Sequence, residues 1–427
     1  MKEHFQEPSG YTYEEALAEA QRCLTCKHKP CVTGCVAHME IPSMIQAFLN
    51  NDGSEARRIS SSYNNFSEIC GRVCYQDQQC QGSCVYAKLG KPIQIGKLER
   101  FINDTYDLPT IEYPQLSGKV AIIGSGPAGL SCAYDCAQSG LDVTIFERSD
   151  QPGGVLRHGI PIYRLPKIIL DQRIAELLAL NVTFKLNQHL GLDFTLESLH
   201  THFDAVLLAV GAQEVNTVSI PGSELPQVIQ WDAFLRTVND GKAAFDAAYG
   251  SAQRVLVVGG GNVAMDVCNA AARWGKSVTL VYRRTRELMP ARPVEVDEVL
   301  THGIDLQPLR DPIAILKKGE SLEVLCKITQ LVASEEDPRG KIVDGVGTQT
   351  VAADLVVLAI GSSVTPIQLD GLILDASNKI VTDDQQRTSL SWLYAAGDAV
   401  TGPKTVVHAL SAGKRAAKAI CEALAHD

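Results

Sequence analysis

Short apolar runs that end at glycine are the most regular pattern along the chain. The runs KVAIIG, AVLLAVG, RVLVVG and VVLAIG begin at residues 119, 205, 254 and 356. Unbroken apolar runs of this length predict strands that are buried on both faces of a parallel sheet. The first and third runs are followed by a glycine turn, helix-forming residues and another strand, across residues 118–148 and 253–284. The pattern therefore predicts an α/β protein with two strand–turn–helix–strand units.

The first hundred residues follow a different pattern and hold most of the cysteines. Residues 41–65 have the spacing of a helical stretch, and eight of the 13 cysteines fall between Cys23 and Cys84. We therefore predict a mainly helical domain over residues 1–117. Of the 427 residues, 45% are hydrophobic and 21% are charged, as in an ordinary globular protein.

Charge and the shortness of the apolar runs argue against several classes of protein. A net charge of −10 is not that of a general nucleic-acid binder. The start, MKEHFQEPSG, lacks the apolar segment of a secretory signal, and the longest apolar runs are too short to span a membrane. We therefore expect a cytoplasmic protein that binds neither nucleic acid nor membrane. Its cysteines are expected to stay reduced, which argues against a disulfide framework.

The first glycine turn has the features of a dinucleotide-binding loop. Gly124, Gly126 and Gly129 form G-x-G-x-x-G after a strand, and Glu147 ends the next strand. The glycines allow a tight turn, a close approach to a pyrophosphate and close helix–strand packing, and the carboxylate can bind a ribose hydroxyl. The predicted site also includes Ser125, Pro127, Ala128 and Arg148.

The second glycine turn is the variant Gly259, Gly261 and Ala264, and it predicts a second dinucleotide site. Its following strand ends at Arg283 and Arg284 rather than at an acid. Guanidinium groups at this place suit a 2′-phosphate, so we predict NADP(H) in preference to NAD(H). The alternative is a solvated basic turn. The predicted site also includes Gly260, Asn262 and Val263.

Three more segments complete this plan. Gly211 and Gly361 each end an apolar strand, as expected where the chain passes between two lobes. Near the C-terminus, Gly397 and Asp398 end a strand, and a long helix is expected from about Thr405 and Val406. An aspartate placed before a helix N-terminus can hold the ribityl chain and the pyrimidine edge of a flavin.

The order of these motifs, together with QPGGVLRHGIPIYRLPK at residues 151–167, resembles the glutamate synthase small-chain family. That family includes the NADPH-oxidising part of dihydropyrimidine dehydrogenase and the large subunit of NADH-dependent ferredoxin–NADP reductase. The resemblance covers essentially the whole chain. It implies two Rossmann-like domains, a FAD domain (118–230 and 363–427) interrupted by an NADPH domain (231–362). Gly154, Leu156 and Arg164 are implied as further FAD-site residues.

The cysteines form two groups with looser spacing than a zinc site. Cys23, Cys26, Cys31 and Cys35 read C-x2-C-x4-C-x3-C, and Cys70, Cys74, Cys80 and Cys84 read C-x3-C-x5-C-x3-C. Structural zinc prefers paired C-x2-C knuckles. We therefore favour two 4Fe-4S clusters over zinc or reduced structural thiols.

The resemblance implies how the cysteines divide between the clusters. One cluster takes Cys23, Cys26, Cys31 and Cys84, and the other takes Cys35, Cys74 and Cys80 with Glu99, which leaves Cys70 unassigned. Whether Glu99 or Cys70 completes the second cluster stays open. The alternative for Glu99 is an exposed acid paired with Arg100 or Lys97. Relatives usually have Cys-Pro where this chain has Cys35-Val36 and Cys74-Tyr75, which leaves the cluster potentials open.

The resemblance implies an electron-input subunit of a hetero-oligomer that oxidises NADPH. Electrons are expected to pass from NADPH to FAD, through two 4Fe-4S clusters, and on to a larger catalytic subunit or a ferredoxin-type acceptor. The leading partner is the large chain of glutamate synthase. The alternatives are the input subunit of a dihydropyrimidine dehydrogenase or of a ferredoxin–NADP transhydrogenase, a stand-alone disulfide reductase, and a non-catalytic cysteine-rich sensor. No catalytic side chain is predicted, because the cofactors supply the chemistry.

Overall fold

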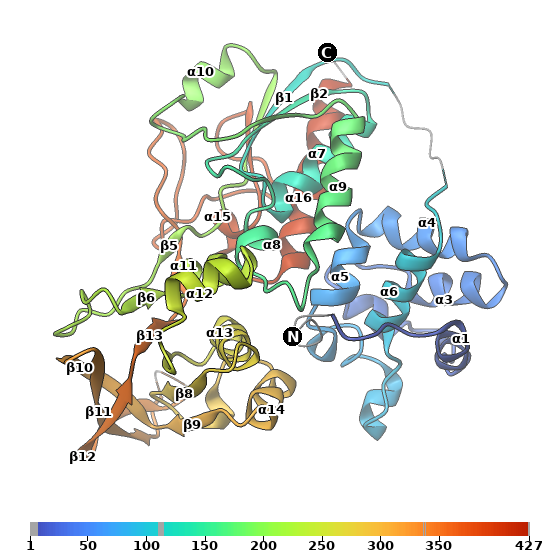
Figure 1. Ribbon diagram of the computed structural model, residues 1–427. Coiled ribbons are helices and arrows are strands. Elements are labelled where there is room, and N and C mark those ends of the chain that lie inside the picture. Colours follow the sequence, from blue (N-terminus) through green and yellow to red (C-terminus); the bar gives the residue numbers. More distant parts are fainter. Residues whose placement is uncertain (1–6, 110–114, 336, 338, 426–427) are drawn as a thin grey trace. The chain divides into compact units, whose positions relative to one another are not determined.

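The computed structural model describes residues 7–109, 115–335, 337 and 339–425. The chain divides into two compact units, which are described separately. The larger unit comprises Glu7–Arg157, Tyr163–Gln213 and Val364–Asp427, and the smaller unit comprises His158–Ile162 and Glu214–Ser363. The N-terminal part of the larger unit is helical, and its remainder is an α/β fold (Figure 1). None of the helices in the described ranges has the length and hydrophobicity that a membrane span requires.

The helical region of the larger unit consists of short helices joined by the cysteine-bearing loops. Its elements are α1 (Tyr13–Gln21), α2 (Pro30–Thr33), α3 (Ile41–Leu49), α4 (Gly53–Tyr63), α5 (Ser67–Val73), η2 (Gln76–Gln78), η3 (Val85–Leu89) and α6 (Ile95–Thr105). Helix α1 begins with a capping box between Thr12 and Glu15, and the Asp52 side chain caps α4. These caps satisfy N–H groups that a helix leaves unpaired at its start.

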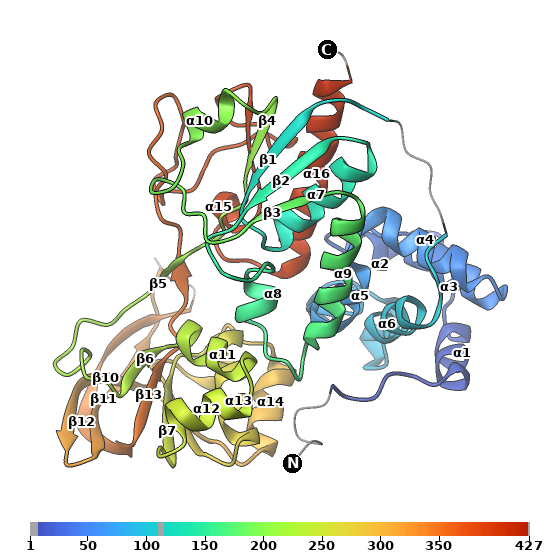
Figure 2. The ribbon, with the colours of Figure 1, turned by 45° about the horizontal axis from the view of Figure 1, so that its top comes forward.

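The α/β region of the larger unit is a parallel sheet in the order β15-β4-β1-β2-β3. Its strands are β1 (Lys119–Ile123), β2 (Asp142–Phe146), β3 (Thr183–Lys185), β4 (Ala205–Leu208) and β15 (Leu393–Ala395). Its helices are α7 (Pro127–Gln138), α8 (Val155–His158), α9 (Lys167–Ala179), α10 (Leu196–His200), α15 (Asp398–Thr401) and α16 (Val406–Leu424), several of which are visible in Figure 2. Helix α8 ends at His158, the first residue of the smaller unit.

The smaller unit repeats this arrangement with a parallel sheet in the order β6-β13-β7-β8-β9. Its strands are β6 (Val228–Gln230), β7 (Arg254–Val258), β8 (Ser277–Tyr282), β9 (Asp305–Pro308) and β13 (Leu355–Leu358). Its helices are α11 (Trp231–Asn239), α12 (Lys242–Tyr249), α13 (Asn262–Arg273), η4 (Arg286–Leu288) and α14 (Pro293–Thr301).

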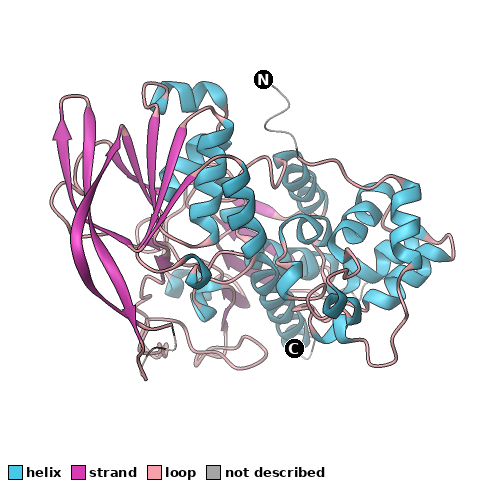
Figure 3. Cartoon of the chain, turned by 90° about the horizontal axis from the view of Figure 1, so that it is seen from below, coloured by secondary structure: helices cyan, strands magenta, loops and turns pink. Residues whose placement is uncertain are grey.

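Two antiparallel pairings complete the smaller unit. Strands β10 (Arg310–Lys318), β11 (Ser321–Val332) and β12 (Lys341–Ala353) form a sheet whose long strands are drawn in magenta in Figure 3. Strands β5 (Glu214–Val215) and β14 (Ser362–Ser363) pair where the chain enters and leaves this unit. The four apolar runs of the sequence are thus β1, β4, β7 and β13, and the predicted fold class is confirmed.

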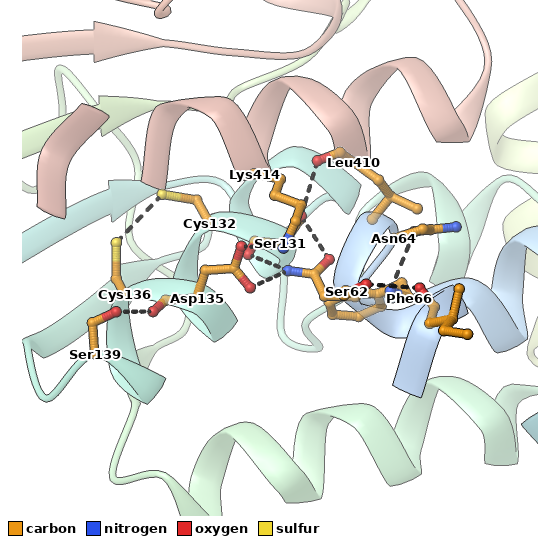
Figure 4. A network of polar contacts seen from close by, with 12 residues as sticks. Ser62, Asn64, Phe66, Ser131, Cys132, Asp135, Cys136, Ser139, Leu410 and Lys414 are labelled. Carbon is orange, nitrogen blue, oxygen red and sulfur yellow. Dashed lines mark hydrogen bonds and ion pairs between the residues drawn. The ribbon is translucent and has the colours of Figure 1, made fainter. Parts of the chain in front are cut away.

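A buried polar contact joins the helical and α/β regions inside the larger unit. The Asn65 amide donates to the Ser131 carbonyl (2.9 Å) and to the Asp135 carboxylate (2.8 Å), in the network drawn in Figure 4. Lys414 of α16 donates to the other oxygen of Asp135 at 2.8 Å. Because each buried polar group has a partner, this contact holds the α4–α5 connection, α7 and α16 in one arrangement.

Candidate functional site

The first glycine loop forms an open cradle at the N-terminus of α7. Gly124 has φ +102°, and a Cβ there would lie 2.4 Å from the Ala209 carbonyl oxygen, so this position requires glycine. A Cβ at Gly129 would lie 2.0 Å from the Gly124 oxygen. By contrast, no described atom lies within 4 Å of a Cβ built on Gly126, and no described side chain caps the helix there. Open space at an uncapped helix N-terminus fits a pyrophosphate.

Glu147 lies beside this cradle at the end of β2. It is 6% exposed and accepts hydrogen bonds from the Ser125 N–H (2.9 Å) and the Ser125 hydroxyl (2.5 Å). The same hydroxyl accepts a hydrogen bond from the Gly153 N–H at 2.9 Å. Arg148 points elsewhere and donates to Gln213 at 2.5 Å. Ser125 therefore couples the acid to the segment that begins at Gly153, a bracing role that the sequence did not indicate.

The segment after β2 packs onto the cradle. A Cβ at Gly154 would lie 2.8 Å from the Gly126 Cα, and Gly154 has φ +52°. The Leu156 side chain is fully buried, whereas Arg164 is half-buried. Gly211 has φ +74° and follows β4. The structure thus brings Gly154 to the glycine loop, as its assignment to the same site requires.

The N-terminus of α16 supplies the other end of this site. Gly397 has φ +76°, and a Cβ on it would lie 3.0 Å from the Ala128 Cβ of α7. Burial raises the pKa of Asp398 to about 6, although the Lys404 N–H donates to its carboxylate at 3.2 Å. No side chain in the described ranges caps α16 at Thr405, whose hydroxyl contacts His408 Nδ1 at 2.6 Å instead. This uncapped helix end beside a half-buried acid fits the polar edge of a flavin.

The second glycine loop, in the smaller unit, repeats the first. Gly259 has φ +146°, and a Cβ there would lie 2.1 Å from the Ala359 oxygen. Gly261 begins α13 without a side-chain cap from the described residues, and no described atom lies within 4 Å of its Cβ position. Asn262 accepts the Arg292 N–H at 3.0 Å, which positions the α14 side of the loop. This cradle also fits a pyrophosphate.

The arginine pair after β8 is divided between solvent and interior. Arg283 is exposed, but Arg284 is 8% exposed and forms an ion pair with Asp337 at 3.0 Å. A buried arginine neutralised by a carboxylate has little charge left for a ligand phosphate. Arg283 is therefore the member of the pair that remains suited to a 2′-phosphate. The sequence did not reveal the Asp337 contact, which spans 53 residues.

Four cysteines from two distant loops lie together near the surface. Cys23, Cys26, Cys31 and Cys84 are all half-buried. Burial, followed by the nearby Cys23 and Cys84 thiols, raises the pKa of Cys31 to about 11. Burial raises the pKa of Cys23 as well, with Cys26 and Cys84 as its thiol neighbours. We refer to these four residues as the outer cysteine group.

The other four cysteines of the helical region form, together with Glu99, an inner cysteine group, which we define as Cys35, Cys70, Cys74, Cys80 and Glu99. They line one cavity. Cys70, Cys74 and Cys80 are buried at 1%, 8% and 7% exposure. Burial is the main cause of the raised pKa of Cys35 and of Cys80, and the hydrogen bond between Cys74 and Cys70 is the first cause of the raised pKa of Cys74. Thiols and carboxyls held neutral in this way would ionise when a cationic cluster arrives, so the donor set fits cluster binding.

Glu99 of α6 lies inside this cavity and not on the surface. It is 5% exposed, and burial, then the Glu68 carboxylate, raises its pKa to about 8. The alternative of an exposed acid paired with Arg100 or Lys97 is therefore wrong. Among the described residues, no three His, Cys, Asp or Glu side chains converge as the ligands of a single metal ion.

Val407 joins the inner cysteine group to the flavin-type site. It lies in the first turn of α16, two residues after Thr405, and it lines the same cavity as Cys35, Cys74 and Glu99. The helix end that fits a flavin edge is thus also a wall of the cysteine cavity. No motif marked Val407 in the sequence, because its role depends on tertiary packing.

Two known families match different parts of the chain, one the helical N-terminal region and the other most of the remainder. Residues 118–413 match the pyridine nucleotide-disulphide oxidoreductase family. Residues 1–109 match the family described as dihydropyrimidine dehydrogenase domain II, 4Fe-4S cluster.

Individual proteins resemble the chain along almost its whole length. It is 33% identical to the glutamate synthase [NADPH] small chain of Halomonas elongata, over 97% of this chain and 92% of that protein. It is 34% identical to the NAD-dependent dihydropyrimidine dehydrogenase subunit PreT of Escherichia coli K12, over 96% and 95%. The solved structure of Mycobacterium tuberculosis FprA in complex with NADPH aligns with a TM-score of 0.59 over 73% of this chain and 85% of that one, at 21% identity, which shows the fold alone.

Proposed function

The chain belongs to the pyridine nucleotide-disulphide oxidoreductase family and, within it, to the glutamate synthase small-chain type, and on this basis we propose that it is an NADPH-oxidising electron-input subunit. It is an oxidoreductase whose cofactors are FAD, a nicotinamide nucleotide and 4Fe-4S clusters. We propose in addition which coenzyme it prefers, which residues hold each cofactor and which partner receives the electrons.

We assign FAD to the larger unit. Gly124, Gly126 and Gly129 would surround the pyrophosphate, and Glu147 would hold the adenosine ribose. Asp398 and the uncapped N-terminus of α16 would face the polar edge of the flavin ring, with the helix N–H groups stabilising negative charge there. The remaining proposed residues are Ser125, Pro127, Ala128, Arg148, Gly154, Leu156, Arg164, Gly211, Gly397, Thr405 and Val406.

We assign NADPH to the smaller unit. Gly259, Gly261 and Ala264 would surround its pyrophosphate, and the exposed Arg283 would bind the 2′-phosphate by charge-assisted hydrogen bonds. The named relatives include both NADPH- and NAD-dependent proteins, so this preference rests on Arg283. The remaining proposed residues are Gly260, Asn262, Val263, Arg284 and Gly361, of which Arg284 would act by fixing the turn.

One observation supports this proposal most strongly: α16 forms part of the wall of the cavity that the inner cysteine group lines. When bound, FAD accepts the hydride of NADPH as two electrons and the clusters carry electrons one at a time. Val407 belongs both to the helix of the flavin-type site and to the cysteine cavity, so it would keep the two cofactors adjacent and exclude water between them. The outer group, which is half-buried, would then lie on the side from which electrons leave.

A disulfide reductase would need two cysteines at the flavin, and the described residues do not favour this. Cys132 and Cys136 are fully buried one turn apart within α7, with sulfur atoms 3.8 Å apart. The hydrogen bond between Cys136 and Cys132 is the first cause of the raised pKa of Cys136, and burial adds to it. Neither thiol is therefore suited to attack a substrate disulfide.

The proposal is tested by anaerobic mixing of the purified holoprotein with NADPH. We expect the flavin absorbance to bleach first and the cluster absorbance to follow, with electron paramagnetic resonance signals of reduced clusters. Flavin bleaching without any cluster reduction would contradict the electron route.

The partner is tested separately, by anaerobic pull-down of the tagged chain from its own cells and mass spectrometry. A large subunit with an amidotransferase segment would identify glutamate synthase, which is the partner that we propose. A subunit with a pyrimidine-binding FMN barrel or a ferredoxin-linked partner would instead identify one of the two alternatives.

A further inference from the structure

The outer cysteine group lies in a basic stretch of an acidic chain. Residues 22–31 contain three Lys or Arg residues and residues 84–91 contain two, with no Asp or Glu in either stretch. The whole chain, in contrast, has 39 basic and 49 acidic residues. Arg22 donates to the Lys91 carbonyl oxygen at 2.6 Å, which joins the two stretches into one surface. The local charge therefore has the opposite sign to the net charge.

The positive charge of this surface is available to a partner. Lys27, Lys88 and Lys91 are exposed. The two neighbouring acids are already engaged, since Glu19 pairs with Arg22 at 2.7 Å and Glu40 pairs with Lys29 at 2.6 Å. These acids therefore neutralise Arg22 and Lys29 and leave the three exposed lysines to set the potential.

Large apolar side chains are also exposed in the two stretches that carry these lysines. Leu24 is 55% exposed, Val85 is 40% exposed and Leu89 is 70% exposed. Leu24 directly follows Cys23, and Val85 directly follows Cys84. Apolar residues inside a charged rim are the arrangement of a protein–protein interface, and here they cover the loops of the outer group.

A surface hollow continues from this region. It has a volume of about 670 Å³ and is lined by Thr25 and Lys29 from the cysteine loop, by residues of α3 and α4 such as Ser43, Glu55 and Ile59, and by Asp52, which caps α4. The hollow contains two acids, and its Lys29 is paired with Glu40, so it does not add to the positive charge of the three exposed lysines.

We propose that Leu24, Lys27, Val85, Lys88, Leu89 and Lys91, which we call the exit surface, dock an acidic, one-electron-accepting protein. This inference rests on the proposed function, because it assumes that electrons leave through the outer group. The balance is NADPH + 2 acceptor(oxidised) → NADP⁺ + H⁺ + 2 acceptor(reduced). Complementary charge speeds the encounter of the two proteins and orients the acceptor on the exit surface.

The test compares two charge-reversed holoproteins with the same change in net charge. The first carries K27E, K88E and K91E, and the control carries K317E, K318E and K341E, three exposed lysines on the antiparallel sheet of the smaller unit. Acidic cytochrome b5 and basic cytochrome c serve as one-electron acceptors, and uncharged benzoquinone reports basal NADPH oxidation. Surface plasmon resonance gives the association rate of each haem protein independently of turnover.

We expect the exit-surface variant to raise the KM for cytochrome b5 and lower its association rate, each on the order of tenfold. Its KM for cytochrome c should fall, while benzoquinone reduction and iron content stay unchanged. The K88E and K91E pair, which lies farther from the cysteines, should show a smaller shift in the same direction. The control variant should leave every value unchanged.

Two results would overturn the docking proposal: an unchanged KM and association rate for cytochrome b5, or an equal effect of the control variant. A wild-type protein that oxidises NADPH with neither benzoquinone nor a haem protein would instead contradict the proposed function. The association rates would still decide whether the surface docks an acidic protein.

Discussion

The two cysteine groups have similar spacing in the sequence but opposite surroundings in the fold. The outer group lies half-buried in loops beside exposed lysines, whereas most of the inner group is buried and shares its cavity with Val407. The inner loops follow α5, which is anchored to the α/β region by Phe66 and Glu68. Two cysteine groups with similar ligands can therefore have different roles, because packing determines which group adjoins the flavin-type site and which lies near solvent.

The largest expected effect comes from breaking the inner group with Cys74→Ser. Removing a buried ligand should lower occupancy of the inner cluster by more than about 100-fold, and reduction of any protein acceptor should fall with it. Flavin bleaching by NADPH should remain, because the glycine loops do not contain Cys74. Anaerobic stopped-flow and electron paramagnetic resonance measure the two steps separately, and acceptor reduction at the wild-type rate would contradict the inner position of this cluster.

The matched change in the outer group is Cys84→Ser, and its effect should be smaller. The inner cluster should still be reduced by NADPH at the wild-type rate, because its own ligands are intact. Reduction of a protein acceptor should fall on the order of 10- to 100-fold with the loss of the outer cluster. If Cys84→Ser removed the reduction of both clusters, the outer group would precede the inner one and the proposed order would be reversed.

Arg173→Met tests the anchor that holds the inner group against the α/β region. Arg173 pairs with Glu68 at 3.2 Å, donates to the Asn65 carbonyl oxygen at 2.6 Å, and lies over the rings of Phe66 and Tyr134. Losing it would leave Glu68 buried without its partner and should lower the free energy of unfolding by about 3 kcal/mol.

Chemical denaturation measures this loss, and Arg58→Met is the control. Arg58 pairs with Glu55 on the exposed side of α4, so its removal should cost about 0.5 kcal/mol. Equal losses of unfolding free energy for both variants would show that the buried ion pair stabilises the protein no more than the exposed one.

A smaller effect should decide which residue completes the inner cluster. We expect Glu99→Ala to lower occupancy of the inner cluster on the order of tenfold, while Cys70→Ala leaves it near the wild-type level. Iron and sulfide content per flavin measures both. The reverse result would assign Cys70 as the ligand and leave Glu99 as a buried neighbour.

The strands and glycine turns could be predicted because their signals are local. Gly124 and Gly259 are needed for backbone reasons that a short stretch reveals, and each follows a buried apolar run. The burial of Glu99 also had a signal, because Ile95, Leu98 and Ile102 place it on the apolar face of α6. In contrast, the pair between Arg284 and Asp337 and the position of Val407 depend on contacts between distant segments. The division of the cysteines came from family resemblance, since spacing alone does not determine it.

Val407→Ala should have the smallest effect. It is also the most direct test of the comparison between the inner and outer cysteine groups. Val407 is 2% exposed and is the residue of α16 that lines the inner cavity. Truncation to alanine should cost about 1–2 kcal/mol of stability and loosen the packing between the helix end and the cysteines. We expect the rate of inner-cluster reduction to fall a few-fold, while flavin bleaching stays unchanged. Val238→Ala, a change of the same size at another buried valine in α11, is the control. If both variants slowed cluster reduction equally, the wall shared by the cavity and α16 would not set this rate, and the inner group would differ from the outer group only in its burial.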